Sequence, residues 1–147
     1  MLDVKFDQRV SLITLAVGDL ERAAAFYEAM GWRRVPSPDG VIAFDLIGQT
    51  LGLYDRAALA EDLGLPATGI GGFSGVTLSH NVRNEEDVAP LMARAEAAGG
   101  RILRPAGEVF WGGFIGYFAD LDGHVWEIAH NPFSTLGPNG EFRWEGY

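Results

Sequence analysis

The stretch at residues 111–132, WGGFIGYFADLDGHVWEIAHNP, decides the fold. It predicts two antiparallel strands, at residues 114–119 and 124–130, that are joined by a tight turn at Asp120-Leu121-Asp122-Gly123. Aspartate and glycine suit such a turn, because aspartate bonds to the nearby backbone and glycine accepts a positive φ. The hairpin is therefore the structural element that the sequence predicts most clearly, and the other elements are assigned relative to it.

Glu127 is the unusual residue of this hairpin. Successive side chains of a strand alternate between its faces, so Glu127 shares a face with Val125 and Ala129 and stands between Trp126 and Ile128 in the sequence. A half-buried strand does not place an acid there by default. Three interpretations stay open. The residue can be a general base with a pKa raised by burial, the partner of a cationic ligand, or a structural acid bonded to backbone or to an arginine.

This hairpin resembles a known one. A glycine-aromatic strand, then F-x-D-[LP]-D-G-H-x-W-E-[IV], then N-P is similar to the closing hairpin of the vicinal oxygen chelate superfamily, which holds glyoxalase I, the bleomycin-resistance proteins and the extradiol dioxygenases. The resemblance covers about residues 9–132. It implies an α+β fold of two paired βαβββ modules around a concave cavity, with Glu127 at one of the four metal-ligand positions of the superfamily.

Composition indicates one globular domain. The chain has 147 residues, of which 48% are hydrophobic and 21% charged. It has no cysteine, so it has no disulfide, thiolate metal site or cysteine nucleophile, and this fits a cytoplasmic protein. No apolar run is long enough for a membrane span, and the N-terminal residues do not read as a signal peptide. The formal charge of −9 argues against nucleic acid and anionic membranes as partners, and it is compatible with a cationic small ligand.

Hydrophobic periodicity predicts the first module, at about residues 9–63. A β-branched apolar run predicts a strand at residues 9–17, and Asp19 is a plausible N-cap for a helix that ends at Gly31. Further strands are expected at residues 32–36, 40–47 and 50–54, with a short helix at 56–63. The module therefore has the order βαβββ.

A glycine-rich linker, GLPATGIGG at residues 64–72, separates this module from the next. A phosphate cradle is a weak interpretation of its glycines, because a strand follows them and not a helix N-terminus. The second module, at about residues 73–132, repeats the pattern. It has a strand at 75–82, a helix capped by Asn84 or Asp87, and a strand at 101–105 before the hairpin. Val17-Gly-Asp-Leu matches Val82-Arg-Asn-Glu at an offset of 65 residues, which indicates a twofold repeat.

The resemblance also locates the four metal-ligand positions. They fall on Leu12 and Gly52 in the first module and on Thr77 and Glu127 in the second. Leucine and glycine offer no side-chain donor, threonine is a poor one, and catalytic zinc or non-haem iron sites need three good protein ligands. His80 lies on the opposite strand face from Thr77, by alternation. We therefore expect no metal and no other cofactor.

What remains is a lined cavity with apolar walls and a few polar groups, as small-molecule sites usually have. The candidate catalytic residue is Glu127. Trp111, in a loop with two glycines, is either a lid or a core-packing aromatic. The residues expected to contact a ligand are Leu12, Thr14, Gly52, Tyr54, Thr77, Ser79, Trp111, Val125 and Glu127.

Two functions follow from this cavity. In the first, the protein is a metal-free member of the superfamily that binds a small aromatic or cationic molecule, similar to the bleomycin-resistance proteins. In the second, it is a small-molecule lyase or isomerase that uses Glu127 for proton transfer, with or without a divalent metal. The fold alone does not choose between them.

The C-terminal tail, at residues 133–147, bears on assembly. Its aromatic side chains, such as Phe142 and Trp144, are expected to pack on the outside of the sheet or in a subunit contact. The first module's ligand-position face is almost wholly apolar, so we expect the binding cleft to combine residues from both modules. These features together predict a homodimer that takes a small-molecule ligand.

Overall fold

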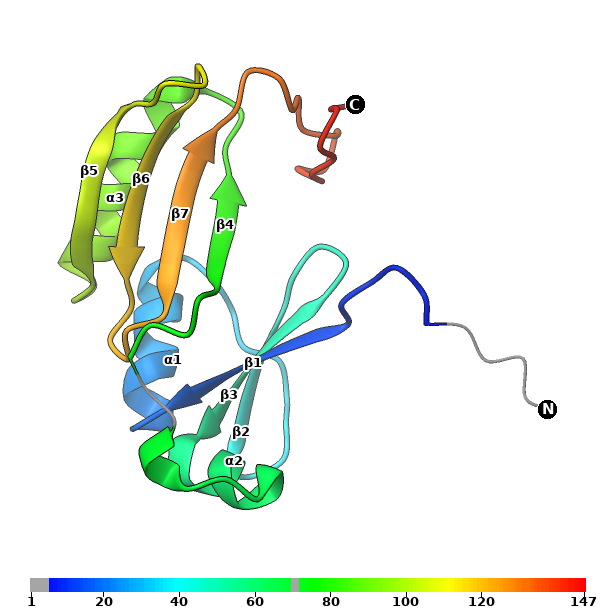
Figure 1. Cartoon of the computed structure of the whole chain (residues 1–147), viewed down its shortest axis with the longest axis vertical. Coiled ribbons are helices and arrows are strands. Elements are labelled where there is room, and N and C mark those ends of the chain that lie inside the picture. Colours follow the sequence, from blue (N-terminus) through cyan, green and yellow to red (C-terminus); the bar gives the residue numbers. More distant parts are fainter. Residues whose placement is uncertain (1–5, 70–71) are drawn as a thin grey trace.

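Two mixed sheets with helices between and behind them form the structure, a computed structural model that describes residues 6–69 and 72–147 (Figure 1). The first sheet has the strand order β1-β3-β2, and the second has the order β4-β7-β6-β5. In each sheet the first strand of the module pairs parallel with the last strand, β1 with β3 and β4 with β7. The α+β class and the two repeated modules are therefore confirmed.

The first module follows its hydrophobic pattern closely. The Asp19 side chain accepts a hydrogen bond from the Arg22 backbone N–H over 3.0 Å, so it caps the first helix as expected. The strand expected at residues 32–36 is wrong, since it is reduced to an isolated bridge between Val35 and Ala43. Pro36 lacks the N–H needed to continue the ladder. The elements are β1 (Leu12–Val17), α1 (Leu20–Ala29), β2 (Val41–Asp45), β3 (Thr50–Asp55) and α2 (Arg56–Leu63).

The second module begins after a short 3-10 turn at Ala67–Gly69. Its second strand, β5, runs past Pro105 to Glu108, three residues further than the sequence indicated. The strand tolerates a proline because it is at the edge of the sheet and its pairing with β6 is interrupted by register shifts. The elements are β4 (Thr77–Asn81), α3 (Val88–Ala97), β5 (Arg101–Glu108), β6 (Phe114–Ala119) and β7 (Val125–His130).

A shared core holds the two modules together. It contains Val17 and Leu53 from the first sheet, Phe26 from α1, and Phe118 and Ile128 from the second sheet, all nearly inaccessible to solvent. Burial of such side chains contributes roughly 1.5–3 kcal/mol each. Because the core uses one face of each sheet, the opposite faces lie outside it. These are the faces to which the ligand-position residues point.

The turn of the hairpin also joins the modules. Asp122 Oδ1 accepts a hydrogen bond from the Gly18 backbone N–H over 2.9 Å, and His124 Nε2 lies 2.8 Å from the Ala16 carbonyl oxygen. Asp120 is buried and accepts the Tyr27 hydroxyl of α1. The D-x-D-G-H run is therefore a docking element between modules, in keeping with a structural role for both aspartates.

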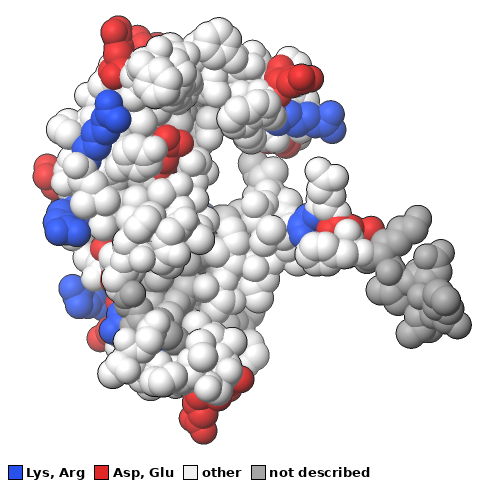
Figure 2. All heavy atoms as spheres, viewed as in Figure 1, with Lys and Arg blue, Asp and Glu red and all other residues white. Residues whose placement is uncertain are grey.

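Acidic and basic side chains are interspersed on the surface. Figure 2 shows them scattered over both modules around a hollow whose visible walls are mostly uncharged. Among the helices of the described ranges, none is long and apolar enough to cross a membrane.

Candidate functional site

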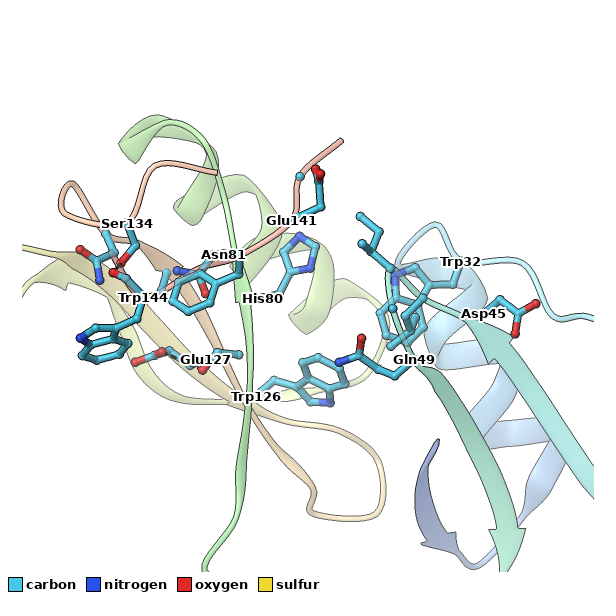
Figure 3. Close-up of a pocket in the computed structure, with 18 of the residues that line it drawn as sticks. Trp32, Asp45, Gln49, His80, Asn81, Trp126, Glu127, Ser134, Glu141 and Trp144 are labelled. Atoms are coloured by element: carbon cyan, nitrogen blue, oxygen red, sulfur yellow. Dashed lines mark hydrogen bonds between the residues drawn. The ribbon is translucent and has the colours of Figure 1, made fainter. Parts of the chain in front are cut away.

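A large pocket lies where the second sheet, the tail and the first module meet (Figure 3). Its volume is about 1570 Å³. The first module contributes Trp32 and the connection between β2 and β3, at residues 45–49. The edge strand β4 contributes residues 79–81, and the tail contributes Phe142 and Trp144 among others. The pocket combines residues of both modules, but those of the first module differ from the ones expected in the binding cleft.

The pocket extends around both sides of β4. Glu127 points to one side, toward Trp144 of the tail, and Ser79 is hydrogen-bonded to it there. We call this part the open-face compartment. His80 and Trp126 have the opposite parity and point toward the first module, in what we call the inter-module compartment. An edge strand permits this arrangement because no neighbour covers its outer side.

Glu127 is the acid of the open-face compartment. It is half-buried, and its Oε1 accepts the Ser79 hydroxyl over 2.9 Å from the partner position on β4. No ion pair to its carboxylate is present among residues 6–69 and 72–147. The arginine partner that the sequence left open is therefore not found there, and neither Arg101 nor Arg104 forms an ion pair with Glu127. A half-buried carboxylate without a cation is suited to a cationic ligand.

Tyr117 is a neighbour of Glu127 that the sequence reasoning missed. It lies opposite Glu127 in the pairing of β6 with β7. Burial raises the pKa of Tyr117, and the neighbouring Glu127 carboxylate raises it further. The same residue pairs with Arg104 of β5 on its other side. The sequence predicted the hairpin but not its register, so it did not identify Tyr117 as the residue opposite Glu127.

The tail is closed on itself and covers part of the open-face compartment. The Ser134 hydroxyl donates to the Trp144 carbonyl over 2.6 Å, and the Tyr147 N–H donates to the Thr135 carbonyl over 3.0 Å. The Arg83 guanidinium ties this loop to the body by donating to the Gly137 carbonyl over 2.6 Å. The tail thus lines the pocket beside the second sheet, and a role of the tail in a subunit contact stays a prediction.

The inter-module compartment has an aromatic wall. Trp32 stacks on Tyr27 with 5.2 Å between ring centroids and meets Trp126 edge-on at 5.7 Å. His80 faces this wall, and partial desolvation of its ring lowers the pKa of His80. The Gln49 amide adds a polar group from the β2–β3 connection. This compartment offers flat apolar area with a few hydrogen-bonding groups.

The pocket contains three of the nine residues that the sequence predicted to contact a ligand. Ser79, Trp111 and Glu127 line it. The other six lie outside its lining: Leu12, Thr14, Gly52, Tyr54, Thr77 and Val125. The sequence did not identify Trp32, Gln49, Phe133, Phe142 or Trp144 as site residues, although it marked the tail as unusually aromatic.

The first-module residues are absent from the lining because their face is a separate surface. Thr14 and Gly52 are register partners, and a Cβ on Gly52 would lie 3.5 Å from Leu12 Cδ1, so these three side chains do share one face. That face is not part of the pocket. The Tyr54 hydroxyl is used elsewhere, donating to Asp62 of α2 over 2.9 Å. The alternation of side chains along the strands placed these residues correctly on a common face. It could not predict whether that face would line the pocket.

Trp111 was expected to be either a lid or a core-packing aromatic, and the structure shows an intermediate position. It is 37% exposed, so it is not a core residue, and its indole folds over Gly113, where a Cβ would come within 2.1 Å of the ring. It also lines the pocket. The aromatic is therefore a wall of the site that requires glycine beside it.

The metal-ligand positions of the superfamily do not fit a resident metal here. Leu12 and Gly52 supply no donor, and Glu127 is engaged by a hydroxyl. Within the described part of the chain, no three histidine, aspartate or glutamate side chains come together as a metal site.

Comparison with protein families agrees with this architecture. Residues 9–128 match the family model described as Glyoxalase/Bleomycin resistance protein/Dioxygenase superfamily. The chain belongs to this superfamily. No match was found among curated proteins.

Solved structures include similar chains. A glyoxalase-related enzyme from Fulvimarina pelagi is 45% identical with a TM-score of 0.85, over 92% of this chain and 97% of that one. A lactoylglutathione lyase from Agrobacterium tumefaciens is 22% identical with a TM-score of 0.65, over 85% and 95% of the two chains. TioX from Micromonospora sp. ML1 is 23% identical with a TM-score of 0.58, over 82% and 96%. The last two show likeness of fold alone.

Proposed function

We propose that this glyoxalase-superfamily protein binds a small aromatic cation in the pocket beside β4, without a metal. The observation that carries the proposal is Glu127, a half-buried carboxylate without an ion-pair partner among the described residues. A carboxylate in such a position gains most from a cation that arrives with the ligand.

The pocket walls support the aromatic part of the proposal. Six aromatic side chains line it: Trp32, Trp111, Trp126, Phe133, Phe142 and Trp144. Aromatic faces attract cations by roughly 0.5–2 kcal/mol each, and they also stack on flat rings. The formal charge of −9 further favours the approach of a positive ligand.

Isothermal titration calorimetry near neutral pH tests this proposal with two probes of the same ring. 2-Naphthylmethylamine is a cation there, and 2-naphthylmethanol is neutral. We expect the amine to bind on the order of tenfold tighter, because only the amine pairs with Glu127. Equal affinity of both probes, or binding of neither, would count against the proposal.

Substitution of Glu127 shows whether ligand binding requires its negative charge or only its shape. Glu127→Gln keeps the volume and the bond to Ser79 while it removes the charge. For the cation probe we expect Glu127→Gln and Glu127→Ala to weaken binding similarly. A pocket for a neutral ligand would tolerate glutamine and lose affinity only with alanine.

A second candidate function is proton transfer by Glu127 to and from carbon beside a carbonyl group. The 45% identical relative from Fulvimarina pelagi, whose structure is that of a glyoxalase-related enzyme, favours it. In this reaction Glu127 takes a proton from the carbon and returns it to the same or the neighbouring atom. Proton exchange of dihydroxyacetone in deuterium oxide, followed by NMR, checks it. Enzyme-dependent exchange that Glu127→Gln abolishes supports this reaction, and exchange at the buffer rate excludes it for this compound.

We further propose that the protein acts as a homodimer. Both β1 and β4 are edge strands, and apolar side chains beside them are exposed, with Leu12 at 55% and Val76 at 58%. A second copy of the chain would bury these strand edges and open sheet faces and so stabilise them. A cytoplasmic location accords with the absence of cysteine.

Sedimentation equilibrium at micromolar concentration tests the assembly. We expect a species of twice the 15.9 kDa chain mass and its dissociation by Leu12→Asp. Leu65→Asp is a matched control, since Leu65 is 54% exposed but belongs to the segment after α2 and not to an edge strand. A 15.9 kDa species alone, or a dimer indifferent to Leu12→Asp, would reject this arrangement.

A further inference from the structure

Four polar residues form a row across the open face of the second sheet. Arg104 on β5 pairs with Tyr117 on β6, Tyr117 pairs with Glu127 on β7, and Glu127 pairs with Ser79 on β4. Directly paired residues of neighbouring strands project on the same face, close enough to interact. The row therefore places one hydroxyl on each side of the Glu127 carboxylate.

Both hydroxyls lie beside the carboxylate. Ser79 donates to Oε1 over 2.9 Å, and Tyr117 holds the register position on the other side of Glu127. An ionised carboxylate has about four acceptor positions and no donor. Ser79 occupies one of these positions, and the others are open to Tyr117 and to a ligand. A group that completes this arrangement has to donate a hydrogen bond.

The negative charge of the Glu127 carboxylate is not compensated by a nearby cation. Arg104 is separated from Glu127 by Tyr117 in the row, and no lysine or arginine within the described residues forms an ion pair with Glu127. A hydroxyl donor orients a carboxylate without neutralising it, whereas an arginine would do both. The ligand group that matches this site is therefore both positive and a hydrogen-bond donor.

We propose that Ser79 and Tyr117 fix the Glu127 carboxylate so that the pocket selects ligands with a protonated amine N–H over quaternary ammonium ligands. Tyr117 is a positioning residue in this proposal, because it acts through Glu127 and does not line the pocket itself. The inference rests on the proposed binding of an aromatic cation and names the chemical class of that ligand.

Calorimetry with three naphthyl cations tests the selectivity. The probes are 2-naphthylmethylamine, its N,N-dimethyl derivative, which keeps one N–H when protonated, and its N,N,N-trimethyl derivative, which has none. We expect the trimethyl compound to bind on the order of tenfold more weakly than the dimethyl compound, although their bulk is similar. In Tyr117→Phe this ratio should fall toward one. Tyr54→Phe, which removes a hydroxyl bonded to Asp62 in the other module, should leave the ratio unchanged.

A ligand-free measurement tests the contact itself. The carboxylate raises the pKa of Tyr117, so Glu127→Gln should let one tyrosine titrate at lower pH in the tyrosinate absorbance. That shift should be absent when Tyr117→Phe is also present. A role of Tyr117 in packing alone would move neither this titration nor the selectivity ratio.

The outcomes separate this inference from the proposed function. Equal binding of the dimethyl and trimethyl cations, or a ratio unaffected by Tyr117→Phe, overturns the inference and leaves cation binding in place. Failure of every cation to bind overturns the proposed function and the selectivity together, and the tyrosine titration then still decides whether Tyr117 and Glu127 interact.

Discussion

The Trp126 indole N–H donates to the Tyr27 hydroxyl over 3.1 Å, across the boundary between the two modules. Tyr27 in turn donates to Asp120, whose other oxygen accepts the backbone N–H groups of Asp122 and His124. The turn and the indole that precede Glu127 are thereby fixed to α1. Packing between the modules and the position of the candidate acid depend on the same set of bonds.

Tyr27→Phe should therefore destabilise the protein more than the loss of one hydroxyl usually does. The ring keeps its place, but the buried Asp120 oxygen and the Trp126 N–H both lose their partner. We expect a decrease in the free energy of unfolding of roughly 1–3 kcal/mol, measured by urea denaturation. Tyr54→Phe is the control, because its hydroxyl bonds to Asp62 at the surface, and should stay within about 0.5 kcal/mol of wild type. Equal effects of the two variants would contradict this account.

Trp144→Ala should weaken the binding of 2-naphthylmethylamine without affecting the fold. Trp144 is 79% exposed, belongs to the tail and faces the same compartment as Glu127. Loss of a cation–π contact of about 0.5–2 kcal/mol corresponds to a decrease in affinity of roughly 2- to 30-fold. Phe110→Ala is the matched control, since Phe110 is fully exposed and does not line the pocket. If calorimetry gives the same affinity for the two variants, the tail does not contribute to binding.

The sequence could predict what depends on local pattern. Alternation along β7 placed Glu127 and Val125 on one face, and the cap at Asp19 marked the start of α1. It failed where a neighbour distant in the chain decides the outcome. The tail could be recognised as aromatic, but its position at the pocket depends on the Arg83 contact with Gly137, which no local pattern encodes. In the same way, the face that carries Leu12 and Gly52 could be predicted, whereas its absence from the pocket depends on how the two modules pack.

Gly100→Ala should be among the most destabilising alanine substitutions at a glycine. A Cβ at this position would lie 2.9 Å from the Ala95 carbonyl oxygen and 3.1 Å from the Ala119 carbonyl oxygen. Backbone atoms cannot move aside as a flexible side chain does, so we expect a loss of about 1–3 kcal/mol in the free energy of unfolding. Gly69→Ala is the control, because nothing lies within 4 Å of its Cβ position and its φ is not positive. Thermal unfolding that ranks the two variants equally would contradict the close approach of α3 and β6 at Gly100.

His80→Asn should reduce the loss of stability that the protein suffers in mild acid. Desolvation lowers the pKa of His80 in the folded state below its ordinary value of about 6.5. Between the folded and unfolded pKa values the unfolded chain binds more protons, so the free energy of unfolding falls as the pH drops below about 6.5. Asparagine does not titrate, and the variant should show a shallower decline in urea denaturation between about pH 7 and 5. A slope unchanged by His80→Asn would mean that its imidazole remains solvated in the inter-module compartment.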